Sequence, residues 1–451
     1  MVQQMEKPAP KEIDPHLAKF ERFERDTKQP SWISPLRRRG IARFAELGFP
    51  SLQDEDWRFT NVAPIARLPF RPIFEAAHDS LTPEVLAGFT FGRLPARRLV
   101  FVNGHYAPNL SSPGVQKPGV TVSSLAAALT TNSALIEQHL ARHAQGENNA
   151  FTSLNTAFFQ DGAFIHVAPG QTVDTPIHLL FVTTAKESGA TAQPRNLILA
   201  DAGSQLTLLE SYVSTVDASY FNNAVTELIL GEGAVVEHGK FQEESPSAYH
   251  MAAVHAHLGR NCSFISHSVA VGARLSRNSI RTVLAGEGVE CVLNGLYLTR
   301  GDQLADHHMV VEHAQPHCNS HEYYNGILDG RSKGVFHGRI LVRQAAQKTD
   351  AKQTNKNLLL SEDATADTKP QLEIYADDVK CTHGATVGQL NEESIFYLRA
   401  RGIGAATARR MLIHAFAGEI IERVRHPAAR EELNHLVWER LEQNPHLAEV
   451  A

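Results

Sequence analysis

The sequence lacks the motifs that most nucleotide-dependent enzymes and hydrolases need. It contains no G-x-x-x-x-G-K-[ST] phosphate loop, because Gly239-Lys240 is followed by phenylalanine and has no glycine at the required upstream position. We therefore expect this chain not to hydrolyse nucleotides by itself. The patterns G-x-S-x-G and H-E-x-x-H and a dinucleotide fingerprint after a strand are also missing. These absences argue against the common serine hydrolases, zinc proteases and dinucleotide-dependent enzymes.

Cysteine is scarce, and the few that occur are widely spaced. The four cysteines form no C-x-x-C pair, which argues against a zinc ribbon or a thioredoxin-like motif. No apolar run approaches the roughly 20 residues of a membrane span. Residues 1–17 contain neither an apolar signal core nor the Arg-rich, acid-poor pattern of a transit peptide. These features predict a cytoplasmic protein, in which disulfides are rare.

A strong excess of either charge is absent too. The 43 basic and 49 acidic residues give a net charge of −6, and no polybasic run stands out. This balance argues against nucleic acid or an anionic membrane as the main partner. The 451 residues are enough for two or three domains with a sizeable core.

The middle of the chain repeats short apolar runs that are separated by glycine, asparagine and aspartate. Six runs, from FIHVAPG to VEHAQPH, are each followed by a small residue: Ala168, Ala200, Gly231, Gly259, Gly286 and Ala314. Successive positions differ by 32, 31, 28, 27 and 28 residues. A repeat of this length built from strands indicates a solenoid, whereas TPR, ankyrin and HEAT repeats need helices. We therefore predict a mainly β fold with a right-handed parallel β-helix over residues 156–390.

The two flanks have helical periodicity instead. The spacing of apolar residues predicts helices within residues 13–48 and at 133–144, 405–425 and 429–443, with one short strand at 98–103. We predict a mixed, largely helical N-terminal domain (1–155) and a C-terminal helical domain (391–451) that serve as caps of the β-helix. The apolar C-terminal helices are also a candidate docking surface.

One stretch near the end of the predicted β-helix, Gln371–Leu390, gathers residues that can bind metal. It places Asp377, Asp378, Cys381 and His383 within seven residues. In an extended chain Cys381 and His383 face the same way. A thiolate with a neutral imidazole suits iron or zinc better than magnesium or calcium. Two such ligands cannot complete a tetrahedral site, so an ordinary strand end with a buried thiol and a hydrogen-bonded imidazole is the alternative.

Three further groups stand out. The segment 306–321 holds residues that indicate either a metal site or exposed imidazoles on coil turns: Asp306, His307, His308, His313, His317, Cys318 and His321. The amides of Gln353, Asn355 and Asn357 alternate, which predicts a structural ladder along one face of a sheet. Trp57 and Phe59 are interpreted as an aromatic anchor under a loop.

Long motifs resemble one known family. LEIYADDVKCTHGATVGQL, followed by IFYLRARGI, is similar to the C-terminal signature of the SufB/SufD family, which assembles iron–sulfur clusters. KCTHGAT and DEDWRFTN (54–61) resemble the SufD branch. Further similarity runs through FTSLNTAFFQDGAFIHV (151–167), GARLSRN (272–278) and QTNKNLLLSEDA (353–364). The resemblance covers most of the chain.

This resemblance implies a non-catalytic subunit of a scaffold complex. SufD-like chains pair with SufB through their β-helices and bind the ATPase SufC through their C-terminal helices. The sequence leaves open whether the chain alone forms a homodimer. The family's implicated histidine falls on His383, with Cys381 as the weaker candidate. Independently of the resemblance, Asp377 and Asp378 are either groups that orient an imidazole or part of a solvated strand end. The resemblance implies a transient iron–sulfur cluster that is shared with SufB and is not bound by this chain alone.

Two other classes of function fit a β-helix. One is a secreted-type, carbohydrate-active enzyme, which needs paired carboxylates and usually aromatic platforms for sugar rings. All three tryptophans (Trp32, Trp57 and Trp438) lie outside the predicted β-helix, which argues against this class. The other is a purely structural scaffold without metal contact, and this class agrees with every pattern described above.

Overall fold

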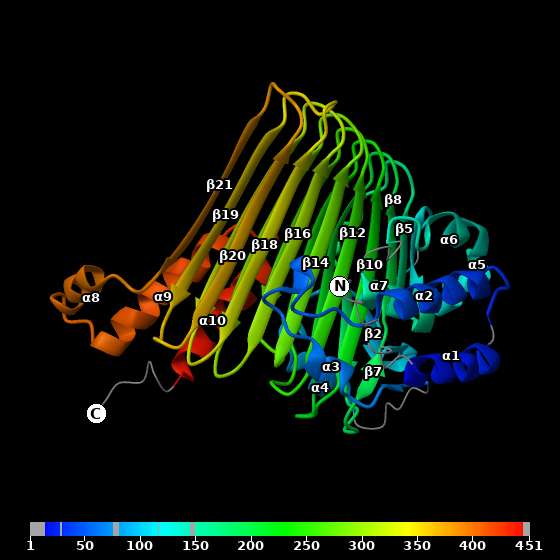
Figure 1. The fold of residues 1–451 in the computed structure, drawn as a ribbon, viewed down its shortest axis with the longest axis horizontal. Helices are drawn as coiled ribbons and strands as arrows, with labels where there is room; N and C mark the ends of the chain where they lie inside the picture. Colours follow the sequence, from blue (N-terminus) through cyan, green and yellow to red (C-terminus); the bar gives the residue numbers. More distant parts are fainter. Residues whose placement is uncertain (1–13, 28, 75–80, 116, 145–148, 445–451) are drawn as a thin grey trace, which may run out of the picture.

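The protein is a parallel β-solenoid flanked by helices (Figure 1). The computed structural model describes residues 14–27, 29–74, 81–115, 117–144 and 149–444. Residues 1–13, which carry most of the segment used to judge targeting, lie outside this range. Within the described residues, no helix combines the length and apolarity needed to cross a membrane.

Two long sheets, here called sheet A and sheet B, form the two walls of the solenoid. Sheet A contains β5 (Ala163–Val167), β8 (Arg195–Ala200), β10 (Phe221–Leu230), β12 (Tyr249–Leu258), β14 (Leu275–Leu284), β16 (Leu304–His313), β18 (Lys333–Val342) and β20 (Thr365–Ile374). Sheet B contains β6 (Ile177–Thr183), β9 (Gln205–Ser214), β11 (Val235–Glu243), β13 (Ser263–Ala270), β15 (Glu290–Thr299), β17 (Asn319–Leu328), β19 (Asp350–Leu359) and β21 (Lys380–Gly388). Neighbouring strands in each series are parallel, so each coil contributes one strand to each wall.

Strand periodicity explains why the repeat folds in this way. Successive side chains of a strand point to opposite faces, so alternate residues of both walls meet inside the coil. Ile198, Leu228 and Val236 are among the inward-facing residues with at most 2% exposure. Each coil has no other way to cover its inner face, and stacking on neighbours therefore stabilises the whole array. The predicted mainly β, parallel β-helical fold is confirmed.

The N-terminal part contributes strands to the solenoid as well as helices. β2 (Arg97–Val102) pairs in parallel with β6, and β4 (Val120–Ser124) pairs antiparallel with β5. β3 (His105–Tyr106) ends sheet B, while β1 (Arg71–Pro72) and β7 (Ala190–Ala192) form a small extension of sheet A. The strand predicted at residues 98–103 is confirmed as β2. The first coil thus begins on strands whose inward residues, such as Phe101 and Val122, are buried.

Helices cover the outer faces of both walls. The N-terminal ones are α1 (Asp14–Asp26), α2 (Ile33–Leu47), the 3-10 turn η1 (Glu55–Trp57), α3 (Ala63–Ala66), α4 (Pro83–Ala87), the 3-10 turn η2 (Pro108–Leu110), α5 (Leu125–Thr131), α6 (Ser133–His139) and α7 (Ala150–Phe158). The helix predicted at 133–144 is observed as α6, which ends at His139 and is shorter than expected. α1, α2 and α7 pack on apolar side chains of sheet A such as Phe221 and Met251.

The C-terminal helices are α8 (Glu392–Arg399), α9 (Ala405–Ile421) and α10 (Pro427–Glu442). α9 and α10 bury apolar residues against the outer face of sheet B, including Ile413 and Val437 against Val269 and Leu296. They lie along the wall and not across the end of the stack (Figure 1). The expectation that both flanks cap the β-helix is therefore wrong at the C-terminal end for the described residues, because the connection after β21 returns the chain along sheet B.

Candidate functional site

The candidate ligands lie on β21, the last strand of sheet B. Cys381 and His383 are two residues apart on this strand and share one face, as predicted for an extended chain. The strand register pairs Ala351 with Cys381 and Gln353 with His383. Ala351 and Gln353 are buried at about 1% exposure inside the solenoid. Both candidate ligands therefore belong to the inward-facing set of residues.

His383 nevertheless remains exposed, because no coil follows β21 among the described residues. The same is true of the apolar inward residues of this last coil, Ile374 at 40% and Val387 at 48% exposure. We call this surface the open end of the solenoid. It presents an imidazole, a thiol and apolar side chains beside the unpaired edges of β20 and β21.

Cys381 lies deeper than His383. It is partly buried against Ile340, Val342 and Ala351. Burial raises the pKa of its thiol, and the nearby carboxylate of Asp350 raises it further. The cysteine is thus held as a neutral thiol until a metal or a base removes the proton.

Asp377 and Asp378 lie in the turn between β20 and β21, not on the strand that carries His383. Asp378 forms an ion pair with Lys348 of the preceding turn, and its backbone N–H donates to Gln347 Oε1 at 2.9 Å. Asp377 is exposed. The structure accounts for Asp378 as part of a turn-to-turn contact, and the role of both carboxylates in orienting the imidazole stays a prediction.

Behind His383 the same column continues into the core with polar residues that sequence reasoning did not assign to the site. A column here means residues that pair in register on successive strands: Glu322, Gln353 and His383 on β17, β19 and β21. Gln353 Nε2 donates to Glu322 Oε2 at 2.7 Å. Burial raises the pKa of Glu322 to about 7, and the hydrogen bond from Gln353 opposes this rise only in part. In the sequence, the alternating amides of Gln353, Asn355 and Asn357 were the feature that could have pointed to this column.

The other two amides of that strand form a structural network, as predicted. Tyr297 Oη donates to Asn357 Oδ1 at 2.6 Å, and Asn357 Nδ2 donates to Asn355 Oδ1 at 2.7 Å. Asn355 Nδ2 donates to the carbonyl of Tyr324 at 3.1 Å. These hydrogen bonds satisfy amides that would otherwise be costly to bury.

The histidine-rich segment 306–321 does not form one metal cluster, because strand alternation sends its members to different faces. Three face the core, two face outward from sheet A, one faces outward from sheet B, and one lies exposed in a turn: His307, His313 and Cys318; Asp306 and His308; His321; and His317. No three of these residues are close enough to share an ion in the described part of the chain. The expectation of a metal cluster is wrong here, and the alternative of exposed imidazoles on turns holds only for His317.

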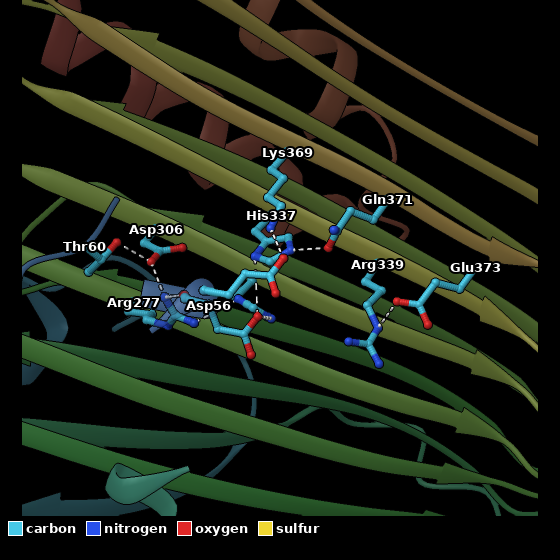
Figure 2. A network of polar contacts seen from close by, with 11 residues as sticks. Asp56, Thr60, Arg277, Asp306, His337, Arg339, Lys369, Gln371 and Glu373 are labelled. Atoms are coloured by element: carbon cyan, nitrogen blue, oxygen red, sulfur yellow. Dashed lines mark hydrogen bonds and ion pairs between the residues drawn. The ribbon is translucent and has the colours of Figure 1, made fainter. Parts of the chain in front are cut away.

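A different trio brings two histidines and a carboxylate together on the outer face of sheet A. Figure 2 labels two of its members, Asp56 and His337. His308 and His337 pair in register on β16 and β18, with ring centroids 4.3 Å apart. Asp56 approaches from the N-terminal segment, with its Oδ1 4.0 Å from His308 Nε2 and from His337 Nδ1. Asp56 is 252 positions from His308 (308 minus 56) and further from His337, so no spacing rule could have predicted that it joins the two histidines.

The hydrogen bonds around this trio oppose metal binding. Arg277 Nη2 donates to His308 Nδ1 at 2.8 Å. A neutral His308 must then carry its proton on Nε2, which is the atom that faces Asp56. The pKa of His308 lies well below its usual value because of burial and the adjacent Arg277. Imidazole ligands bind through a free lone pair, and His308 has none toward Asp56, so the trio as built is an electrostatic contact at 4.0 Å and not a prepared metal site.

The contact attaches the DEDWRFTN segment to sheet A (Figure 2). Arg277 stacks on Trp57 with its guanidinium carbon 3.7 Å from the ring centroid. Thr60 Oγ1 donates to Asp306 Oδ2 at 2.5 Å. Lys369, on β20 at the end of sheet A, pairs with Glu55 at 2.6 Å. The interpretation of Trp57 as an aromatic anchor is supported, and the segment also reaches the final coil.

Comparisons with known proteins agree with the motifs. The family model "SUF system FeS cluster assembly, SufBD core domain" matches residues 181–416, and "SufBD protein N-terminal region" matches residues 18–179. An iron–sulfur cluster assembly SufBD family protein of Synechocystis is 34% identical over 397 residues, which are 86% of this chain and 87% of that protein. The iron–sulfur cluster assembly protein SufD of Escherichia coli is 33% identical over 410 residues, covering 90% and 93%. The SufD protein of Bacillus subtilis is 27% identical over 425 residues, covering 91% and 94%.

Proposed function

The chain belongs to the SufB/SufD family of the SUF iron–sulfur cluster assembly system, and we propose that it is a SufD-like, non-catalytic subunit of a SufB–SufC–SufD scaffold. Similarity to proteins named SufD over about nine-tenths of their length supports this assignment. It leaves no support for a carbohydrate-active enzyme. The four free cysteines are compatible with the reducing cytoplasm, where we place the protein.

The observation that carries the proposal is an inward-facing histidine at an uncovered end. His383 occupies a core position, yet it is exposed because the stack stops at β21. Imidazole binds iron while neutral near physiological pH. His383 and Cys381 are too few to enclose a cluster, so the iron–sulfur cluster is a transient cargo that needs further ligands from a SufB-like partner.

The partner pairs with this chain through the open end. Parallel strands β20 and β21 leave backbone groups unpaired on their outer edges, and such edges invite another strand. The exposed side chains of Ile374, Tyr375 and Val387 add apolar contact area there. The same features support a homodimer when the chain is alone.

The helices after β21 bind the SufC-like ATPase in this proposal. α9 and α10 are anchored on sheet B, whereas α8 exposes Phe396 at 71% and Tyr397 at 57%. An aromatic pair on a short exposed helix is typical of a docking surface. Phe396→Ala with Tyr397→Ala should abolish capture of the ATPase in a pull-down, with Met411→Ala as the control. Unchanged capture would move the docking site elsewhere.

The central test replaces His383. The His383→Ala chain is co-expressed anaerobically with SufB- and SufC-like partners, and cluster content is followed by absorbance together with the size of the complex. We expect an intact complex and a loss of cluster formation. His317→Ala, which removes an exposed histidine from a middle turn, should form clusters at the wild-type rate. An intact His383→Ala complex that assembles clusters normally would favour the purely structural scaffold.

A further inference from the structure

Gln353 has a buried amide oxygen without a hydrogen-bond partner. Its side chain is about 1% exposed, and its Nε2 donates to Glu322 Oε2 at 2.7 Å. Its Oε1 makes no hydrogen bond among the described residues. Leaving a buried acceptor unpaired costs about 1–3 kcal/mol, so an unpaired atom at this position needs an explanation.

The column shows which residues lie on either side of this amide. Glu322 precedes Gln353 in the stack and His383 follows it, and all three face the core. The amide nitrogen is directed to the preceding strand, and the oxygen on the same planar group diverges from it. On the remaining side the register places His383, the next residue of the column.

The opposite wall leaves room for this amide. A Cβ added at Gly338 of β18 would lie 2.2 Å from Gln353 Nε2 and 2.9 Å from its Oε1. Any side chain larger than hydrogen at position 338 would therefore displace the amide. The glycine therefore leaves the space that the Gln353 amide occupies.

We propose that Gln353 is the positioning residue of the site: its Oε1 accepts the N–H of one His383 ring nitrogen, so that the other nitrogen presents its lone pair to iron at the open end. This inference rests on the proposed function of His383. Metal-binding histidines commonly donate their second N–H to such an acceptor, which fixes both tautomer and ring orientation.

Glu322 sets the orientation of the amide. A carboxylate only accepts hydrogen bonds, so while Glu322 is ionised the amide nitrogen must face it and the oxygen must face His383. Reversal of the amide would turn its N–H groups toward His383 and occupy the lone pair of that ring nitrogen. The three residues thus form one directed chain of hydrogen bonds.

The first test removes the amide without changing the length of the side chain. Gln353→Met, assembled with the SufB- and SufC-like partners, should form clusters at least tenfold more slowly, which is the usual effect of losing such a contact. Asn357→Leu is the matched control, because it removes a buried amide from the same strand four residues from Gln353. It should lower the melting temperature and leave the rate within about twofold. Equal losses in both variants, or a normal rate in Gln353→Met, would overturn the inference.

The second test exchanges the carboxylate and the amide, so that the hydrogen bond between positions 322 and 353 runs in the opposite direction. In the double variant Glu322→Gln with Gln353→Glu, the new amide donates to the new carboxylate, whose second oxygen again faces His383. Cluster formation should return to within about threefold of wild type, whereas Gln353→Glu alone brings two buried carboxylates together and should stay slow. Failure of the double variant in an intact complex would contradict the proposed role.

A third measurement does not depend on cluster assembly. A crystal structure of the wild-type chain should show one orientation of the His383 ring with a nitrogen within hydrogen-bond distance of Gln353 Oε1, and Gln353→Met should lose this single orientation. A different protein partner on Oε1 would overturn the inference. Normal clusters in His383→Ala together with the ordered contact would instead refute the proposed function and leave the contact as observed.

Discussion

His238 and His383 occupy the same inward-facing column of sheet B, five strand positions apart, yet they have different surroundings. His238 lies in the middle of the stack at 1% exposure, where Glu210 Oε1 is 3.2 Å from its Nε2 and Ser266 Oγ is 3.0 Å from its Nδ1. His383 lies at the open end and is exposed.

Position in the stack, and not residue type, decides what an inward-facing histidine can do. Both ring nitrogens of His238 have protein partners, so neither is free for a ligand. Burial alone would raise the pKa of Glu210, but hydrogen bonds from His238, Tyr212 and Thr226 outweigh it and lower the pKa. At the open end, His383 has a neighbouring strand, β19, on one side only. Its other side is free for a metal or a second chain.

The largest expected effect on stability comes from breaking a buried ion pair, which we compare with breaking an exposed one. Arg195 and Glu227 are fully buried between sheet A and the N-terminal helices, with Nη2 and Oε1 2.6 Å apart. Arg195→Met leaves a buried carboxylate without its charge partner and should lower the free energy of unfolding by about 3–5 kcal/mol. Lys348→Met breaks the exposed pair with Asp378 at the open end and should cost at most about 1 kcal/mol. Denaturant titration measures both, and similar costs would remove the contrast.

The second prediction concerns pH and the buried carboxyl behind the open end. Burial raises the folded-state pKa of Glu322 to about 7, above the value of about 4.5 for an exposed glutamate. The folded state then binds more protons between these values, so stability falls as pH rises from about 4.5 to about 7 and is constant above it. The full contribution is on the order of 3 kcal/mol. Glu322→Gln should flatten this part of the profile, as measured by unfolding at pH 5 and pH 8. An unchanged slope would show that other groups cause it.

The third prediction compares the two histidines directly. His238→Leu leaves Glu210 with fewer donors in the core and should lower the free energy of unfolding by about 1–3 kcal/mol. His383→Leu removes an exposed side chain whose single proposed protein hydrogen bond is to Gln353 Oε1, and should lower the free energy of unfolding by about 1 kcal/mol or less, because water reaches this end of the solenoid. Thermal unfolding of the isolated chain measures both values. A larger cost for His383→Leu would mean that the open end is covered in the isolated protein.

The smallest effect is expected at the outward-facing pair, His308 and His337. Arg277 occupies Nδ1 of His308 and the proton of a neutral His308 lies on Nε2, so the trio lacks a free lone pair on this histidine, and added zinc should not raise the melting temperature through this trio. The control is His337→Ala. A zinc-induced rise that disappears in this variant would show that the trio rearranges into a metal site.

Much of the fold could be predicted from the chain alone. The interval of 27 to 32 residues between small residues indicates coils, and the alternation along each run indicates which residues face the core. The same alternation places Cys381 and His383 on one face. These features depend on residues close in sequence, and their local periodicity is sufficient to predict them.

Other features depend on residues far apart. The path of α9 and α10 along sheet B follows from the turn after β21 and from apolar side chains on several strands at once. The contact between Asp56 and the histidines joins positions more than 250 residues apart. Sequence patterns do not encode such pairings, because they arise only after the coils are stacked.

The role assigned to Gln353 shows the same division at the site itself. In the sequence, the three alternating residues of 353–357 all carry side-chain amides, and this pattern predicts one structural ladder that includes all three. Register separates them: Gln353 lies between Glu322 and His383, whereas Asn355 and Asn357 join Tyr297. The sequence determined which residues face inward, because alternation is local. The tertiary structure decided which of them is last, because only the end of the stack leaves an inward side chain exposed.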